Sequence, residues 1–281
     1  MIASVAPSCM VYAPAGTRRQ AALAGLRVDS EQYAQWSRTQ MIAACNLLFA
    51  HGVKHIFTIL ATPGQFREVG HYRERLIDWI DWGVAGPEAL ADYCELGWNV
   101  RLIGAHEIDD LAGAVERVRN LPRADDEKTL WCWVIPDADA SWRWMRSAIC
   151  LAGRTRQEAI RWMYGQDVPA AGLFLGFGKP VVTDYLFPPL LSDNIQCYWT
   201  QRPGYALTQR ELRTVLYDYT YLRPTWQADK TLRAEHVMTQ RDVWESGLIL
   251  GVGRRFGPFW YPESQHSQSV TDEKPASSEQ T

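Results

Sequence analysis

The chain has 281 residues, of which 47% are hydrophobic and 22% charged, so it can bury the core of one α/β domain or of two small ones. Its formal net charge of −3 at pH 7 gives no electrostatic footprint for nucleic acid, whose binding proteins are typically basic. No run of 18 apolar, uncharged residues occurs, and residues 1–7 lack the basic start and long apolar run of a secretory signal. We therefore expect a cytoplasmic protein without a transmembrane helix.

Short apolar runs alternate with amphipathic segments along most of the chain. Strands are predicted at 9–13, 53–61, 99–104, 129–135, 171–177 and 195–200. Helices are predicted near 31–50, 65–82, 86–97, 107–119, 138–150, 154–165, 208–222 and 237–247. This alternation predicts an α/β fold with a six-stranded, mainly parallel sheet covered on both faces. Ligands of such sheets bind beyond the carboxyl ends of the strands.

The last residues of the chain differ in character from the rest. Residues 262–281 are polar and can bury almost nothing, so we predict a disordered tail there and a single folded domain over 1–261. The six cysteines form no CxxC pair and most lie in apolar surroundings, which favours reduced, buried thiols. No spacing typical of a His/Cys metal site is present. Most of the thirteen tryptophans are expected to fill the core, with an aromatic pocket for a hydrophobic cation as the alternative.

Residues 13–19 place a glycine turn and two adjacent arginines between the first predicted strand and a helix. A strand-to-helix junction presents backbone N–H groups and the positive end of a helix dipole, and both attract phosphate. The guanidinium groups of Arg18 and Arg19 add charge-assisted contacts to phosphate oxygens. On local chemistry alone, an exposed arginine pair at a helix start is usually only a solvated surface.

Five sequence blocks, in order along the chain, carry a resemblance to a known family. They lie at 16–19 (Gly-Thr-Arg-Arg), 47–53, 174–179, 216–223 and 251–253, with Phe259 and Trp260 behind the last. The first block resembles the diphosphate loop of cis-prenyltransferases such as undecaprenyl diphosphate synthase. The ordered set is similar to an offshoot of that fold, the (iso)tuberculosinol synthase-like bacterial diterpene synthases.

The resemblance implies a cis-prenyltransferase-like fold, a homodimer formed through the C-terminal half, and an isoprenoid diphosphate as substrate. It implies that the diphosphate is bound by Ala15, Gly16, Thr17, Arg18, Arg19 and Arg27. The spacing at Arg27 matches the family's further diphosphate-binding arginine imperfectly. Mg²⁺ is usual in the family, so it is a candidate cofactor here.

Ala15 is the main departure from the family pattern. The family carries an aspartate at this position, immediately before the glycine, and that carboxylate is associated with Mg²⁺ and the departing diphosphate. Three explanations stay open: ionisation without this ligand, a divergent or inactive member, or an alanine introduced in place of a natural aspartate. No metal ligand is therefore assigned.

Four further residues are candidates for the site. Tyr33 aligns with a tyrosine near the diphosphate in the resembled synthases, where a phenol can donate to a phosphate oxygen or assist proton transfer. We assign it a catalytic role with Arg18 and Arg19, and its alternative is a core tyrosine. Trp36, Asp184 and Asp218 are pocket candidates, although each aspartate can equally fix a loop or helix by hydrogen bonding.

The resemblance and one omission together indicate the reaction. Chain-elongating cis-prenyltransferases bind a second diphosphate through an arginine-rich stretch, but residues 176–184 carry only one cation, Lys179. This favours a single substrate, which the resemblance implies is a bicyclic labdane- or halimane-type C20 diphosphate. The predicted enzyme ionises it and quenches the cation by deprotonation or with water. The alternatives are prenyl transfer to a small nucleophile and a non-catalytic subunit.

Overall fold

The computed structural model describes residues 5–124, 127–152, 155–222, 231–247 and 249–263. The chain forms two compact units, the larger comprising 1–177 and 181–223 and the smaller 178–180 and 224–281. The predicted domain limits, 1–261 and 262–281, stay a prediction. Apart from Pro262 and Glu263, the predicted tail lies outside the described residues.

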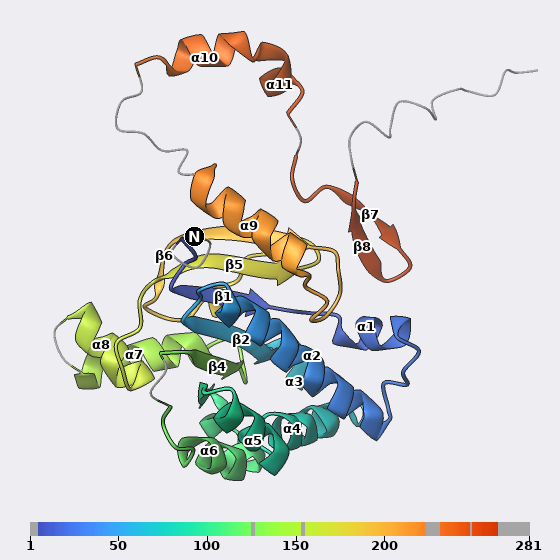
Figure 1. Cartoon of the computed structure of the whole chain (residues 1–281), viewed down its shortest axis with the longest axis vertical. Coiled ribbons are helices and arrows are strands. Elements are labelled where there is room, and N and C mark those ends of the chain that lie inside the picture. Colours follow the sequence, from blue (N-terminus) through green and yellow to red (C-terminus); the bar gives the residue numbers. More distant parts are fainter. Residues whose placement is uncertain (1–4, 125–126, 153–154, 223–230, 248, 264–281) are drawn as a thin grey trace, which may run out of the picture. The chain divides into compact units, whose positions relative to one another are not determined.

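A six-stranded parallel sheet is the centre of the larger unit (Figure 1). Its strands are β1 (Cys9–Ala13), β2 (His55–Ala61), β3 (Asn99–Ile103), β4 (Thr129–Val134), β5 (Ala171–Phe177) and β6 (Ser192–Thr200). Their order is β3-β4-β2-β1-β5-β6, and every neighbouring pair is parallel. The near-continuous apolar runs of β1, β2, β4 and β5 fit strands that are buried on both faces. The predicted α/β fold class is confirmed.

The helices of the larger unit follow the strands in alternation. They are α1 (Thr17–Leu23), α2 (Glu31–Ala50), α3 (Pro63–Phe66), α4 (Tyr72–Gly83), α5 (Pro87–Glu95), α6 (Ala112–Arg119), α7 (Ala140–Ala152), α8 (Arg156–Tyr164) and α9 (Gln209–Tyr221). Short 3₁₀ turns occupy Ala105–Glu107, Asp109–Leu111 and Asp184–Leu186. Capping boxes at Thr155 and Thr208 fix the starts of α8 and α9, because each threonine and a glutamate three residues later satisfy backbone N–H groups.

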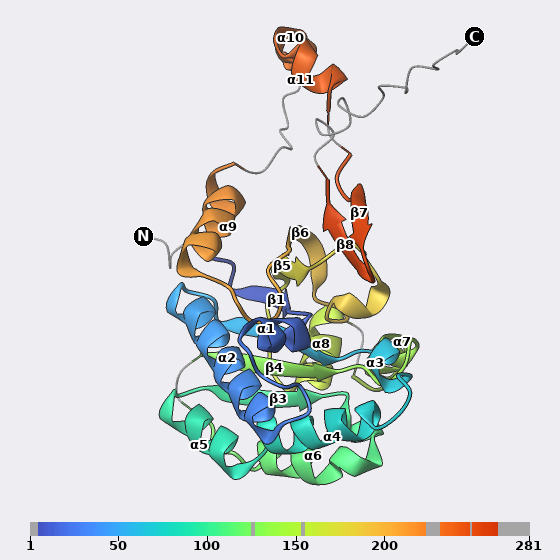
Figure 2. The same cartoon turned by 90° about the vertical axis from the view of Figure 1, so that its right-hand side faces the viewer.

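Helices cover both faces of the sheet (Figure 2), and each face carries its own apolar layer. On one face, the buried side chains of α2, α4, α5, α6 and α9 pack with those of the strands. On the other face, α7 and α8 cover an aromatic layer. There Phe57 stacks on Trp131 with ring centroids 5.3 Å apart, and Tyr164 meets both rings edge-on. Trp131 and Trp133 are almost fully buried, as expected of tryptophans that fill the core.

Several element boundaries differ from the prediction. The helix predicted at 65–82 is two helices, α3 and α4, and between them Gly70 has a left-handed φ of +78°, which a continuous α-helix does not contain. The helix predicted at 107–119 begins only at Ala112, after two 3₁₀ turns. β6 begins at Ser192, three residues before the predicted start. The prediction missed these residues because they are exposed at the sheet edge and lack an apolar pattern.

The described part of the smaller unit contains α10 (Arg233–Thr239), α11 (Arg241–Glu245), β7 (Gly253–Phe256) and β8 (Phe259–Pro262). The single helix predicted at 237–247 is therefore two short ones. β7 and β8 form an antiparallel hairpin that the sequence did not predict, with Arg255 opposite Trp260. A left-handed glycine in its turn, Gly257 with φ +57°, makes the tight reversal accessible.

Two expectations from composition concern membranes and cysteines. Among the described residues, no helix is long and apolar enough to cross a membrane. Cys9, Cys45 and Cys132 are buried and burial raises their thiol pKa values, whereas Cys94 and Cys150 are exposed. Cys197 is half-buried, so the two exposed thiols, on the outer faces of α5 and α7, are the exceptions to the expected burial.

Candidate active site

The predicted diphosphate loop leaves the carboxyl end of β1 and enters α1 through Gly16. Gly16 has a left-handed φ of +79°, which glycine adopts without strain. A Cβ atom at this position would lie 3.2 Å from both the guanidinium of Arg19 and Cβ of Pro203. The loop is therefore packed closely on both sides, and a glycine is required for this conformation.

The segment after β6 holds the other side of this loop. The backbone N–H of Gly204 donates to the carbonyl of Ala15 at 2.7 Å. The amide oxygen of Gln20, in α1, accepts from the N–H of Tyr205 at 2.8 Å. Sequence reasoning missed this support, since the partners lie far apart in the chain and glycine and glutamine are common in loops.

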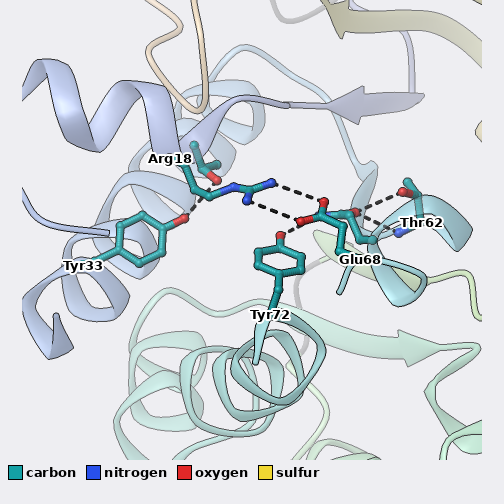
Figure 3. A network of polar contacts seen from close by, with 7 residues as sticks. Arg18, Tyr33, Thr62, Glu68 and Tyr72 are labelled. Carbon is teal, nitrogen blue, oxygen red and sulfur yellow. Dashed lines mark hydrogen bonds and ion pairs between the residues drawn. The ribbon is translucent and has the colours of Figure 1, made fainter. Parts of the chain in front are cut away.

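Arg18 projects toward α3 and α4 (Figure 3). Its two terminal nitrogens donate to the carboxylate of Glu68 at 3.3 and 3.4 Å, and its guanidinium lies 4.4 Å from the ring centroid of Tyr72. About half of its side chain is exposed. Arg18 is therefore oriented by a carboxylate and an aromatic face while remaining accessible to a ligand.

Arg19 lies on the side of β5. Its guanidinium is 4.7 Å from the ring centroid of Phe177, the last residue of that strand. Partial burial and the neighbouring charge of Arg18 lower its pKa. The positive charges of Arg18 and Arg19 repel each other, and an anion that contacts both relieves this repulsion.

Tyr33 meets the diphosphate loop from the first turn of α2. Its hydroxyl and that of Thr17 are 3.1 Å apart, and either can donate (Figure 3). Ser30 caps α2 by accepting from the backbone N–H of Tyr33, which fixes the start of this helix. Burial raises the pKa of Tyr33, so the phenol stays protonated and able to donate at neutral pH.

Tyr72 belongs to a small polar network that sequence reasoning missed. Its hydroxyl accepts from the amide nitrogen of Gln65 at 3.2 Å, and Gln65 in turn accepts from the backbone N–H of Thr62 at 2.9 Å. These contacts connect the carboxyl end of β2, through α3, to the start of α4. Neither Tyr72 nor Glu68 belongs to a recognisable sequence motif. A predicted loop between α3 and α4 is the one signal that could have identified them as candidates.

Comparison with known proteins identifies the family. The chain matches no established family model. It is 43% identical over 270 residues to (+)-kolavelool synthase of Herpetosiphon aurantiacus, a match that covers 95% of this chain and 93% of the relative. The chain belongs to the (iso)tuberculosinol synthase-like bacterial diterpene synthases. As a member of this terpene synthase family, it is an enzyme.

A second relative agrees with this assignment, and two solved structures share the fold. Tuberculosinyl adenosine transferase of Mycobacterium tuberculosis is 25% identical over 274 residues, covering 92% of this chain and 91% of the relative. Lavandulyl diphosphate synthase from Lavandula x intermedia, solved with dimethylallyl diphosphate, shares the fold at a TM-score of 0.61 and 12% identity, over 78% of this chain and 97% of that one. A probable undecaprenyl diphosphate synthase from Campylobacter jejuni aligns at a TM-score of 0.51 and 12% identity, over 78% and 98%. The predicted cis-prenyltransferase fold is confirmed.

Not every candidate of this diterpene synthase lies in the loop's contact network. Arg27 is highly exposed and donates to Asp29, its near neighbour, at 2.8 Å. Asp184 is exposed and accepts from the backbone N–H of Tyr185. Asp218 accepts from the hydroxyl of Tyr198, which fastens α9 to β6. The contacts seen for both aspartates fit the structural alternative, and their pocket role stays a prediction.

Trp36, the remaining pocket candidate, is half-buried in α2. It lies one helical turn beyond Tyr33, so it shares approximately the same face of α2. Its place on the helix fits a pocket wall near Tyr33, and its role also stays a prediction.

The synthase family implies Mg²⁺, and the donor set of this loop allows a test of fit. Among the described residues, no three His, Cys, Asp or Glu side chains gather as a metal site. Ala15 offers no side-chain oxygen, whereas Glu68 brings a carboxylate to Arg18. Mg²⁺ is commonly held by one or two carboxylates together with substrate phosphates. The residues fit Mg²⁺ if Glu68 and the diphosphate supply the oxygens.

A cavity of about 400 Å³ lies at the carboxyl ends of β3 and β4, on the α7–α8 face. The rings of Trp133, Trp144, Trp162 and Tyr164 contribute to its walls. The indole nitrogen of Trp133 is buried, and it has no hydrogen-bond partner within the described part of the chain. Arg143 and Arg146 also line this cavity, so the aromatic pocket for a cation that the tryptophan content suggested stays a prediction.

Proposed function

We propose that this diterpene synthase ionises a bicyclic, labdane- or halimane-type C20 diphosphate and quenches the resulting cation by deprotonation or with water. The observation that supports it most is the adjacent pair Arg18 and Arg19 beyond the carboxyl end of β1, with Tyr33 bonded to the same loop. The relative named (+)-kolavelool synthase supports a C20 terpene product.

The chain's own residues account for the ionisation. As the allylic C–O bond breaks, its electron pair stays on the diphosphate oxygen, where negative charge grows. Arg18, Arg19 and the backbone N–H groups that open α1 hold this charge, and such preorganised donors typically give the largest catalytic contribution. Tyr33, kept neutral, donates a hydrogen bond or a proton to the leaving oxygen.

The cation that remains needs apolar walls that tolerate positive charge. Aromatic faces do this through their quadrupoles, and they also exclude bulk water until quenching. Trp36, one helical turn beyond Tyr33 on α2, is a candidate for such a wall. Loss of a proton gives an alkene, and capture of water followed by loss of its proton gives an alcohol.

Two alternatives rest on specific observations. The relative named tuberculosinyl adenosine transferase supports prenyl transfer from the same cation to a small nucleophile. A non-catalytic subunit is favoured only by Ala15, and the retained contacts of Arg18 and Tyr33 argue against it. Elongation of a chain is disfavoured, since residues 176–184 carry Lys179 alone as a cation.

Incubation with a panel of C15, C20 and cyclised C20 diphosphates, followed by mass spectrometry, tests the proposed function. We expect a C20 hydrocarbon or alcohol and inorganic pyrophosphate from a cyclised C20 diphosphate alone, without an added acceptor. Product formed only when a nucleophile is added would favour prenyl transfer. No turnover of any substrate would favour the non-catalytic alternative.

We also expect a homodimer that buries aromatic surface from the C-terminal half of the sequence. The outer face of α9 carries a groove of about 770 Å³, where Tyr217 and Tyr221 are 58% and 57% exposed and their rings lie 5.0 Å apart. Replacing both tyrosines with glutamate is expected to convert a dimer to a monomer in sedimentation velocity at micromolar concentration. A wild-type monomer with full activity would contradict this expectation.

A further inference from the structure

Glu68 is the carboxylate that contacts the proposed diphosphate site. It lies in the loop between α3 and α4, and its two oxygens accept from Arg18 at 3.3 and 3.4 Å (Figure 3). The side chains of Arg18 and Glu68 are 51% and 37% exposed, so a ligand can reach both. Gly70, two residues on, has a left-handed φ of +78°, and a Cβ atom placed there would meet open space.

This position creates an electrostatic conflict when a diphosphate binds. An anion on Arg18 is brought close to the carboxylate of Glu68, and like charges at such range repel strongly near a protein surface. A cation between them removes the repulsion. Arg18 and Arg19 supply two positive charges, whereas the diphosphate and Glu68 together carry at least three negative charges.

We propose that Glu68 is the protein ligand that shares Mg²⁺ with the substrate diphosphate, supplying the carboxylate that Ala15 lacks. This inference rests on the proposed function, because it needs a diphosphate at Arg18. Mg²⁺ keeps several waters and is satisfied by one or two carboxylates plus phosphate oxygens, so a single glutamate suffices. In the complex, Arg18 exchanges the carboxylate for phosphate, and Glu68 is released for the metal.

A simpler role for Glu68 makes a different prediction. If it only orients Arg18, its loss weakens anion binding equally with and without metal. If it is a metal ligand, its loss removes the benefit of Mg²⁺ and also removes a repulsive charge. Without metal, loss of Glu68 therefore lowers anion affinity if Glu68 only orients Arg18, and leaves it unchanged or raises it if Glu68 is a metal ligand.

Calorimetry with inorganic pyrophosphate separates the two roles. We expect wild type to bind pyrophosphate about tenfold or more tightly in Mg²⁺ than in EDTA, the scale on which metal-site residues commonly act. Glu68→Gln is expected to lose this advantage, and in EDTA to bind pyrophosphate as tightly as wild type or more so. Because Mg²⁺ also binds pyrophosphate in solution, the comparison is made between variants at the same Mg²⁺ concentration.

Two further variants serve as control and rescue. Glu88→Gln removes another glutamate that pairs with an arginine, Arg38 at 2.8 Å, and should leave the Mg²⁺ advantage intact. Adding Ala15→Asp to Glu68→Gln is expected to restore part of the tighter pyrophosphate binding in Mg²⁺. An unchanged Mg²⁺ advantage in Glu68→Gln, or an equal loss of affinity in Mg²⁺ and EDTA, would overturn the metal role while leaving the proposed function standing. Failure of wild type to bind pyrophosphate in either condition would remove both.

Discussion

Arg18→Ala and Arg19→Ala are each expected to weaken pyrophosphate binding by about 1.5–3 kcal/mol, the usual contribution of a hydrogen bond to a charged group. Turnover of the diphosphate substrate should fall further, by about 10²–10³-fold, because charge on the leaving group is greatest in the transition state. Calorimetry gives the first quantity and product formation the second. Neither variant should unfold the protein, since Arg18 is half exposed and Arg19 borders solvent at the loop.

A matched control for these variants is Arg161→Ala. Arg161 pairs with Asp167 at 2.7 Å on the surface of α8, outside the loop's contact network, so its loss should alter neither binding nor turnover. Unchanged pyrophosphate affinity in both Arg18→Ala and Arg19→Ala would rule out this anion site.

Tyr33→Phe is expected to lower the turnover number by about 10²–10⁴-fold, the usual contribution of a positioned proton donor. Pyrophosphate affinity should change much less, because the arginines hold the charge. The variant keeps the ring in place and loses only the hydroxyl that contacts Thr17. Single-turnover kinetics with the diphosphate substrate measures the chemical step directly.

The pH dependence of this step has a defined sign. The protonated phenol is the active form, and it is present below its pKa and lost above it. Because burial raises the pKa of Tyr33, the rate should stay level beyond pH 10, the ordinary tyrosine pKa. Tyr217→Phe, which removes an exposed hydroxyl from α9, is the control. A rate for Tyr33→Phe within twofold of wild type would show that Tyr33 only supports the loop.

The sheet was predictable because parallel strands buried on both faces must be almost wholly apolar. An apolar run of the length of 55–61 is typical of a buried strand and is shorter than a typical buried helix. The predicted strand limits match those of the structure to within a few residues. Helix limits were less predictable. Gly70 and the 3₁₀ turns before α6 interrupt amphipathic patterns that are continuous in sequence, and the hairpin β7–β8 lacks the typical turn pair.

The candidate site was predictable only where its residues are consecutive. Residues 16–19 and Tyr33 were found because a glycine turn, two arginines and a resemblance coincide. Glu68, Tyr72 and Gly204 were missed, since their relation to the loop depends on tertiary contacts across 50 residues or more. No local propensity encodes contacts of that kind.

The support of the diphosphate loop by the segment after β6 has a consequence for folding. The bond from Tyr205 to Gln20 closes a separation of 185 residues, so its entropic cost is met only after most of the sheet has assembled. During synthesis, Arg18 and Arg19 leave the ribosome early, but their loop cannot acquire its final shape until β6 has paired with β5. The newly made chain therefore passes through a long stage in which the sheet is forming and the diphosphate loop still lacks its support.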